Sequence, residues 1–149
     1  MKIYAGSDHA GFELKQALVA EARRLGHEVV DLGTDSTDRV DYPDFGAKVG
    51  RAVAGDPSSR GLLVCGSGIG IAMAANKVPG VRAAVVWDEE SSRLSRLHND
   101  ANVVAIGARL VSPERAREML KVWLETAFEG GRHQPRIEKM AELDRDGRG

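Results

Sequence analysis

The sequence predicts a doubly wound α/β domain, in which a five-stranded parallel sheet carries helices on both faces. Five short apolar runs alternate with segments whose apolar residues recur at helical spacing. The runs are apolar throughout, which is typical of parallel strands covered on both faces. The expected strands are Lys2–Ala5, Glu28–Leu32, Gly61–Cys65, Arg82–Val86 and Val103–Ile106. Together these features indicate a Rossmann-like or flavodoxin-like fold.

Helical patterns fill the intervals between these strands. The apolar face of the first helix consists of Leu14, Leu18, Ala22 and Leu25, and that of the second of Phe45, Val49, Ala52 and Val53. Gly26 stands where the C′ residue of the first helix is expected. A third helix is expected over Ile71–Lys77, and a fourth ends near His98. The fifth begins with Ser112-Pro113-Glu114, which supplies an N-cap, a proline at the first helical position and an acid in the first turn.

The C-terminal tail is a separate unit. Segment 125–131, which contains two glycines, interrupts the helical pattern, and 132–143 then forms a shorter amphipathic helix with Ile137, Met140 and Leu143 as its apolar residues. A detached helix of this kind packs either on a neighbouring subunit or back on its own sheet, and the pattern alone favours neither. We therefore expect one domain over residues 1–149, with an α/β core over 1–128 and a tail over 129–149.

Size and composition restrict the classes of function. The 149 residues suffice for one domain that buries roughly 70% of its unfolded surface. The 21 basic and 22 acidic residues nearly cancel, which gives no electrostatic basis for binding nucleic acid or a membrane surface. No segment approaches the ~18 continuous apolar residues of a membrane span. A single cysteine excludes an internal disulfide and fits a reducing compartment, so we expect a cytoplasmic protein.

Cys65, the only cysteine, ends the third expected strand and precedes the loop Gly66-Ser67-Gly68-Ile69-Gly70. A thiol just before a helix N-terminus meets free backbone N–H groups and the positive end of the helix dipole. Both stabilise the thiolate, so Cys65 can act as a base or a nucleophile near neutral pH. The alternative is structural, because a lone cysteine at the end of a buried strand often acts as a small apolar residue.

Polar residues follow the carboxyl ends of the expected strands, where open parallel sheets bind their ligands. In chain order they are Asp8 and His9, Asp41–Asp44, Cys65 with its glycine loop, Asp88, and Arg109. The glycine loop suits an anion, since glycines let backbone N–H groups approach a ligand. It lacks the third glycine of a dinucleotide fingerprint, although Asp88 lies about twenty residues further on and keeps a nicotinamide site as an alternative. The loop Gly6–Gly11 lacks the Lys and Ser or Thr of a P-loop.

Further titratable residues lie outside these loops. His98 and Asn99 end the fourth helix, where a histidine can simply complement the negative end of the dipole. Arg132 and Arg136 share a face if the tail is helical there, and two adjacent guanidinium groups suit a phosphate dianion; the alternative is a solvated basic surface. The four histidines lack the close spacing of zinc sites, and one cysteine cannot form a structural metal site, so we expect no metal and no cofactor.

Eight segments of the chain form a pattern that resembles a known family. They are Gly6–Gly11 with Glu13–Lys15, Val40–Asp44, Cys65–Gly70, Ala75–Lys77, Arg82–Ala84, His98–Asn102, Gly107–Arg109 and Gly131–His133. In order, spacing and residue type they resemble the ribose/galactose phosphate isomerase family, in particular its type B ribose-5-phosphate isomerases. The resemblance runs from the first strand into the tail.

The resemblance implies a metal-independent interconversion of an aldose phosphate and a ketose phosphate through a cis-enediolate. The substrate it implies first is D-ribose 5-phosphate, which gives D-ribulose 5-phosphate in the pentose phosphate pathway. In that reaction Cys65 removes the C2 proton and returns it to C1. The backbone N–H groups around Ser67, Gly68 and Gly70 hold the enediolate oxyanion, with Ser67 donating its hydroxyl, and Gly66 and Ile69 of the same loop also bind the substrate. Asp8 moves protons between O1 and O2 or orients the hydroxyls.

By the same resemblance, His98 opens the furanose ring, Asn99 holds a sugar hydroxyl and Tyr42 lines the pocket. The implied phosphate ligands are His9, Arg109, Arg132 and Arg136. Members of this family form homodimers, or tetramers built from dimers, whose sites join loops of two subunits. This favours an exchanged tail that packs on a partner subunit, with Arg132 and Arg136 serving the partner's Cys65.

Small departures from the family pattern sharpen the prediction. Ser67 stands where many members carry Thr, which keeps the hydroxyl. Some members use a glutamate of the following helix in place of the cysteine, but Ile71–Ala74 offers no carboxylate. The presence of Cys65, His98 and the arginines on one chain argues against the galactose 6-phosphate type, which divides the work between unlike subunits. The remaining alternatives are an isomerase of allose 6-phosphate, galactose 6-phosphate or a tetrose phosphate, and a non-catalytic phosphosugar-binding module.

Overall fold

The computed structural model, which describes residues 1–147, confirms the expected fold class. Five parallel strands form one sheet in the order β2-β1-β3-β5-β4. The strands are β1 (Lys2–Ser7), β2 (Glu28–Asp31), β3 (Arg60–Cys65), β4 (Ala83–Val86) and β5 (Val103–Gly107). Their ends differ from the expected ones by one or two residues. In β1 and β5 the reason is pairing: Ser7 pairs with Val64 and Gly107 with Cys65, so both strands continue past their last large apolar residue.

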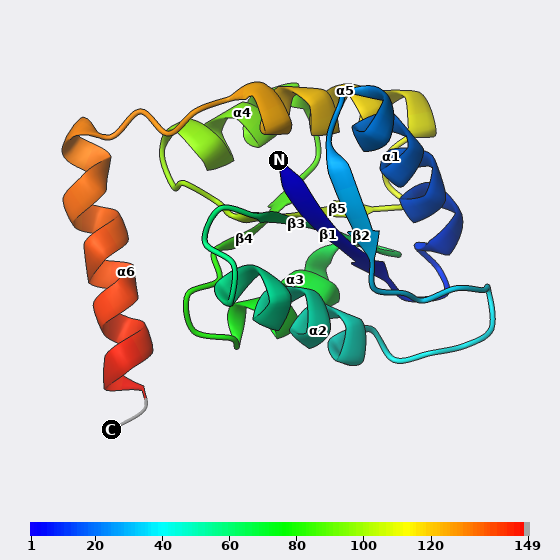
Figure 1. The fold of residues 1–149 in the computed structure, drawn as a ribbon, viewed down its shortest axis with the longest axis horizontal. Helices are drawn as coiled ribbons and strands as arrows, with labels where there is room; N and C mark the ends of the chain where they lie inside the picture. The colour runs from blue at the N-terminus through cyan, green and yellow to red at the C-terminus, as the bar shows by residue number, and fades with distance from the viewer. Residues whose placement is uncertain (148–149) are drawn as a thin grey trace.

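Helices cover both faces of the sheet (Figure 1). Helices α1 (Phe12–Arg24), α4 (Glu89–Leu97) and α5 (Pro113–Glu125) lie on one face, and α2 (Tyr42–Ala54) and α3 (Ile69–Asn76) lie on the other. Two residues predicted to cap helix ends, Ser112 and Gly26, do so in the structure. The Ser112 hydroxyl accepts a hydrogen bond from the Arg115 N–H at 3.2 Å, and Gly26 follows α1 with φ of +96°.

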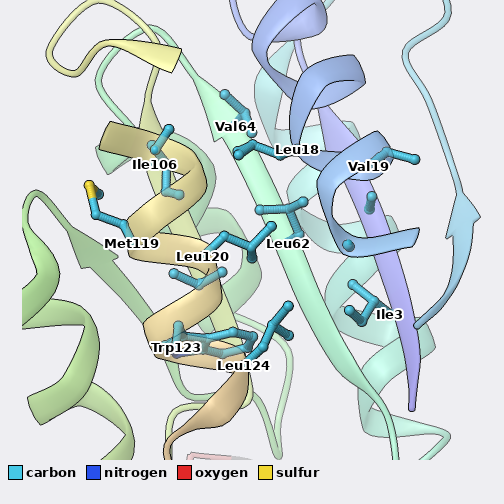
Figure 2. Packing of buried hydrophobic residues seen from close by; sticks show 14 of the residues in the cluster. Ile3, Leu18, Val19, Leu62, Val64, Ile106, Met119, Leu120, Trp123 and Leu124 are labelled. Atoms are coloured by element: carbon cyan, nitrogen blue, oxygen red, sulfur yellow. The ribbon is translucent and has the colours of Figure 1, made fainter. Parts of the chain in front are cut away.

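Two apolar layers fix the sheet between its helices. On the α1 and α5 face, fully buried side chains from both helices pack on the central strands (Figure 2); among them are Leu18, Met119, Leu120, Trp123, Ile3, Leu62 and Ile106. On the α2 and α3 face, Val49 and Ile71 pack with Leu63 and Val103. Each such side chain contributes about 1.5–3 kcal/mol through burial, so the strand ends that carry the site are held rigidly.

The strand order places a topological switch point between β1 and β3. From β1 the chain leads outward to β2, whereas from β3 it leads in the opposite direction to β5 and β4. The loops after β1 and β3 therefore diverge, and the crevice between them is where open α/β sheets bind ligands. Asp8 and Cys65 lie at this point.

The tail stands beside the layers (Figure 1). A short 3₁₀ turn, η1 (Gly131–His133), precedes helix α6 (Gln134–Asp146). The α-helix begins two residues later than the sequence predicts, with Pro135 in its first turn. Of its residues only Ile137 is buried, and near its end Asp144 accepts a hydrogen bond from the Gly80 N–H at 2.8 Å. Packing of the tail on a partner remains a prediction, and residues 148–149 of that predicted segment lie outside the described residues.

Among the helices within residues 1–147, none is both long enough and apolar enough to span a bilayer.

Candidate active site

Cys65 is buried at the end of β3, and its Sγ accepts a hydrogen bond from the Gly68 N–H at 3.1 Å. Gly68 is the N-cap of α3 and has φ of +79°. A Cβ on this residue would lie 3.0 Å from the carbonyl carbon of Ile106 and 3.1 Å from the Gly107 nitrogen, so both space and conformation require glycine. A backbone N–H directed at sulfur stabilises the thiolate. The resemblance had implied that this N–H faces the substrate oxyanion, whereas here it faces the thiol.

The glycine loop is attached to the loop after β5. The Ala108 N–H donates to the Cys65 carbonyl at 2.9 Å, and the Arg109 N–H donates to the Gly66 carbonyl at 3.0 Å. Within the loop, the Ser67 hydroxyl accepts a hydrogen bond from the Ile69 N–H at 3.1 Å. The thiol is therefore positioned by backbone contacts from two strand ends.

A cavity of about 540 Å³ opens beside the thiol at the carboxyl edge of the sheet. Eight predicted site residues line it: Asp8, Tyr42, Cys65, Gly66, Ser67, Ile69, Gly70 and Arg109. Met73 and Leu110 complete the lining, and the sequence reasoning missed them. Leu110 directly follows the site residue Arg109, which could have indicated it, whereas Met73 stands between two alanines and has no such signal. Both side chains are about two-thirds exposed (64% and 67%).

Asp8 faces this cavity from the loop after β1. It is buried, its Oδ1 accepts a hydrogen bond from the Gly11 N–H at 2.9 Å, and its own N–H donates to the Val64 carbonyl at 3.3 Å. These bonds hold the Asp8 carboxylate next to the residue that precedes Cys65, which suits a group that moves protons on a bound molecule.

His9 and Tyr42 join the loop after β1 to the start of α2. The Nδ1 of His9 lies 3.2 Å from both the N–H and the carbonyl oxygen of Val40. Two residues later Tyr42 begins α2, and its ring lies so close to Gly70 that a Cβ there would come within 2.6 Å of it. Loops that are distant in sequence thus converge around one thiol.

The remaining predicted residues form a second group. His98, the C-cap of α4, stacks on His133 of η1, with ring centroids 4.3 Å apart and planes inclined by 19°. A carboxylate oxygen of Glu129 lies 3.4 Å from the His133 Nε2. Burial, and next the positive charge of Arg132, lower the pKa of His133 below its usual value. Arg132 lies in η1 and Arg136 in α6, and both side chains are exposed.

This second group is separated from Cys65 by the length of the strands, because it lies near the amino edge of the sheet and Cys65 at the carboxyl edge. Helix α4 returns toward the amino edge, so His98 lies close to the start of β5, where the Asn102 carbonyl accepts a hydrogen bond from the Gly61 N–H at 2.8 Å. Cys65 ends β3, about 13 Å further along the strand. Neither His98 nor Asn99 lines the cavity at the thiol. The family resemblance places only Arg132 and Arg136 at the site of a partner subunit. The structure shows that His98 and Asn99 also lie away from the Cys65 of their own chain.

Asp88 does not reach the cavity either. Its Oδ1 accepts a hydrogen bond from the Ser91 N–H at 2.7 Å, and the Ser91 hydroxyl accepts one from the Asp88 N–H at 3.2 Å. This is a capping box at the start of α4. The acid required by a nicotinamide site therefore has a structural role here, and that alternative loses its support.

Among residues 1–147, the ligand atoms of His98, Glu129 and His133 lie within 4.8 Å of one another, close enough to approach one metal ion. Two observations oppose metal binding. The stacked rings are nearly parallel, so their nitrogens do not point at a common centre. The charges of Arg132 and Arg136, which help to lower the His133 pKa, also repel a cation. The absence of a metal stays a prediction.

Comparison with known proteins identifies the family. The sequence model of the Ribose/Galactose Isomerase family matches residues 3–140. The chain belongs to this family. Among relatives, ribose-5-phosphate isomerase B of Escherichia coli (strain K12) is 47% identical over 143 residues, which cover 96% of each chain. The family resemblance seen in the motifs is thus confirmed.

Solved structures of the family agree with this fold. Ribose-5-phosphate isomerase B of Clostridium thermocellum is 46% identical and superposes with a TM-score of 0.96 over 99% of both chains. The Mycoplasma genitalium protein of the same name, solved with bound ribulose-5-phosphate, is 38% identical and gives a TM-score of 0.94 over 97% of both chains.

Proposed function

We propose that this protein is a ribose-5-phosphate isomerase, which interconverts D-ribose 5-phosphate and D-ribulose 5-phosphate without a metal. The observation that carries the proposal is the Cys65 thiol, which accepts a backbone hydrogen bond and lines the same cavity as the Asp8 carboxylate. Relatives similar over nearly the whole chain bear this enzyme name, and one was solved with ribulose-5-phosphate. The single buried thiol is consistent with a reducing cytoplasm.

Cys65 serves as the base for the proton transfer. Its thiolate removes the proton from C2 of the open-chain aldose, and the electron pair forms the C1–C2 double bond of the enediolate. Asp8 transfers a proton from O2 to O1. The Cys65 thiol then returns its proton to C1, which leaves the ketone at C2. The Gly68 N–H holds the thiolate ready for the first step, and the Ser67 hydroxyl with the Gly70 N–H stabilises the oxyanion.

Ring opening and phosphate binding fall to residues of a second copy of the chain. His98 protonates the furanose ring oxygen and Asn99 holds a hydroxyl, while Arg132 and Arg136 join His9 and Arg109 around the phosphate. The support for this assignment is that His98 and Cys65 lie at opposite ends of the strands, which prevents one copy from bringing the two together.

Exposed apolar side chains support association of two copies. Ile69, Met73 and Leu110 surround the mouth of the thiol cavity and are 52%, 64% and 67% exposed. On the tail, Met140 and Leu143 line a groove of about 500 Å³ between α6 and the region around Gly80–Ala84. Apolar surfaces of this kind mark protein interfaces. We propose a homodimer, or a tetramer built from such dimers, with shared sites.

The test is turnover of ribose 5-phosphate by the purified protein without added metal. Replacement Cys65→Ala removes only the Sγ atom, which is the base, so the rate of ribulose 5-phosphate formation should fall about 10³-fold. A circular dichroism spectrum and unfolding temperature equal to those of the unmodified protein serve as the control. Retention of most activity by Cys65→Ala would refute the assigned base.

Allose 6-phosphate and erythrose 4-phosphate should be assayed in parallel. If kcat/KM is higher for either of them than for ribose 5-phosphate, that sugar phosphate is the substrate, and the reaction is still an aldose-ketose isomerisation. Binding of ribose 5-phosphate with no turnover of any of the three would indicate a phosphosugar-binding module.

A further inference from the structure

A second cavity, of about 490 Å³, opens at the amino edge of the sheet, opposite the Cys65 cavity. The charged side chains of its lining are three arginines and one carboxylate, Arg60, Arg82, Arg96 and Asp100. The volume lies within the range of small-ligand sites in proteins. None of these four residues has a part in the proposed isomerisation.

Two of the arginines are fixed in place by backbone carbonyls. The Arg96 side chain is 5% exposed, and it donates to the Thr126 carbonyl at 3.1 Å and to the Ala101 carbonyl at 2.7 Å. Arg60 donates to the Trp123 carbonyl at 3.1 Å. Both guanidinium groups also lie against the Trp123 ring, with centroid distances of 5.2 Å for Arg60 and 5.9 Å for Arg96. Their positions therefore do not depend on a ligand.

The positive charge of this cavity is only partly compensated. Asp100 is shared: one carboxylate oxygen lies 2.8 Å from Arg96, and the other lies 3.6 Å from Arg82. Within residues 1–147, Arg60 has no carboxylate at ion-pair distance. Burial, and next the charge of Arg96, lower the pKa of Arg60 to about 10. The positive charges of Arg60, Arg82 and Arg96 thus lie close together around the cavity.

We propose that this cavity binds a small phosphorylated anion, held by Arg60, Arg82 and Arg96. Each guanidinium carries five donors in a planar fork, and the backbone bonds and Asp100 use only some of them. The free donors can form paired hydrogen bonds to phosphate oxygens. An anion in this position neutralises the positive charge of the three arginines that Asp100 leaves uncompensated.

An anion bound in this cavity can change the position of the second group of site residues, which includes His98. Arg96 and Asp100 flank His98 and Asn99 in the sequence, and Asp100 has a φ of +46°, which is unusual for a residue other than glycine. A bound anion competes with the Asp100 carboxylate for Arg82 and Arg96, and a displaced Asp100 moves the segment that carries His98. This consequence rests on the proposed function, whereas the binding site does not.

The binding test uses inorganic pyrophosphate and isothermal titration calorimetry on the full chain. An Arg109→Ala/Arg132→Ala/Arg136→Ala background removes the arginines proposed to hold the substrate phosphate. We expect this background to bind one pyrophosphate per chain. Adding Arg60→Met or Arg82→Gln should weaken the affinity about tenfold, the effect of losing one charged hydrogen bond. Arg93→Gln, an exposed arginine on α4 that lies outside the cavity, is the matched control and should leave affinity unchanged.

Two results would overturn the proposal: no binding by the background protein, or an affinity that neither Arg60→Met nor Arg82→Gln changes. Arg82→Gln is essential, because Arg82 does not contact Trp123 and its loss leaves that packing intact. A separate assay follows ribose 5-phosphate turnover by the otherwise unmodified protein, where pyrophosphate should reduce kcat, and Arg82→Gln should raise the pyrophosphate concentration needed for that effect about tenfold. Binding that depends on Arg60 and Arg82 in a protein with no isomerase activity would reject the proposed function and keep the site.

Discussion

The two halves of the proposed site are built in different ways. Around Cys65 the geometry comes from backbone: the Gly68 N–H reaches the thiol, and the loop after β5 donates two N–H groups to the Cys65 and Gly66 carbonyls. Around His98 it comes from side chains at helix ends, namely the stacked His133 and the nearby Glu129. The first half is complete in one copy of the chain. The second lies away from the thiol of its own chain, and we propose that it meets the thiol of a neighbouring copy.

The strongest test of this comparison is complementation between two inactive variants. Cys65→Ala and His98→Asn each remove one half, so each homodimer should lose nearly all activity. When the two are mixed and exchange subunits, half of the dimers are hybrids with one intact site of two. Activity should therefore recover to about a quarter of that of the unmodified protein.

The control for this experiment is a mixture of Cys65→Ala with Asp8→Asn. Both changes lie in the same half, so their hybrids contain no intact site and should stay inactive. Native mass spectrometry reports whether hybrids have formed. Hybrids of the first pair that remain inactive would show that the halves do not meet across two copies.

Gly68→Ala should damage the backbone-built half. Its Cβ would approach the backbone of Ile106 and Gly107 and shift the N–H from the thiol, so kcat should fall about 10²-fold. Gly26→Ala is a matched control, because Gly26 also has positive φ, has no atom within 4 Å of the added Cβ and is remote from the cavity. Gly26→Ala should lose about 1 kcal/mol of stability and Gly68→Ala more, because of its contacts, but only Gly68→Ala should lose rate. Equal rates for the two would contradict the assigned role of the loop.

The side-chain half should respond to pH through His133. Burial lowers the pKa of His133 in the folded chain below its value in the unfolded chain. At a pH between these two pKa values, His133 is protonated in the unfolded chain and neutral in the folded chain. The contribution of His133 to the free energy of unfolding is present above about pH 6.5 and is lost as the pH falls toward the folded pKa. His133→Phe keeps the stacked ring and does not titrate, so the loss of stability between pH 7 and 5 should be smaller.

Urea unfolding at several pH values measures this difference. His27, whose pKa is lowered by burial and then by the N-terminal charge, leaves a residual slope in both proteins. Identical slopes for the two proteins would mean that His133 is not held neutral in the folded chain.

The smallest expected effect concerns Asp88, which follows a strand like the site residues but belongs to neither half. Asp88→Ala removes the capping box of α4 and should lower the free energy of unfolding by about 1 kcal/mol. With the cap lost but the cavity untouched, kcat for ribose 5-phosphate should stay unchanged. A large fall in kcat would give Asp88 a part in the site.

Much of the backbone-built half could be predicted from the sequence. Each of Asp8, Tyr42, Cys65 and Arg109 follows or lies near the end of a strand segment, and parallel strands bring those ends to one edge. Met73 and Leu110 were missed because an apolar residue in sequence does not reveal whether it is buried. The separation of His98 from Cys65 was also missed, although a helix between parallel strands must return to the amino edge.

By itself, the sequence determined the order of the elements, the parallel sheet, the glycine loop around Cys65 and the family. These follow from local periodicity and from residues that are close in the chain. Only the tertiary structure decided which groups meet. In the folded chain His98 stacks on His133, and Asp88 caps helix α4. Arg60, Arg82 and Arg96 line one cavity. The physical reason is that such contacts join residues far apart in the chain, and their positions depend on how the strands order and the helices pack.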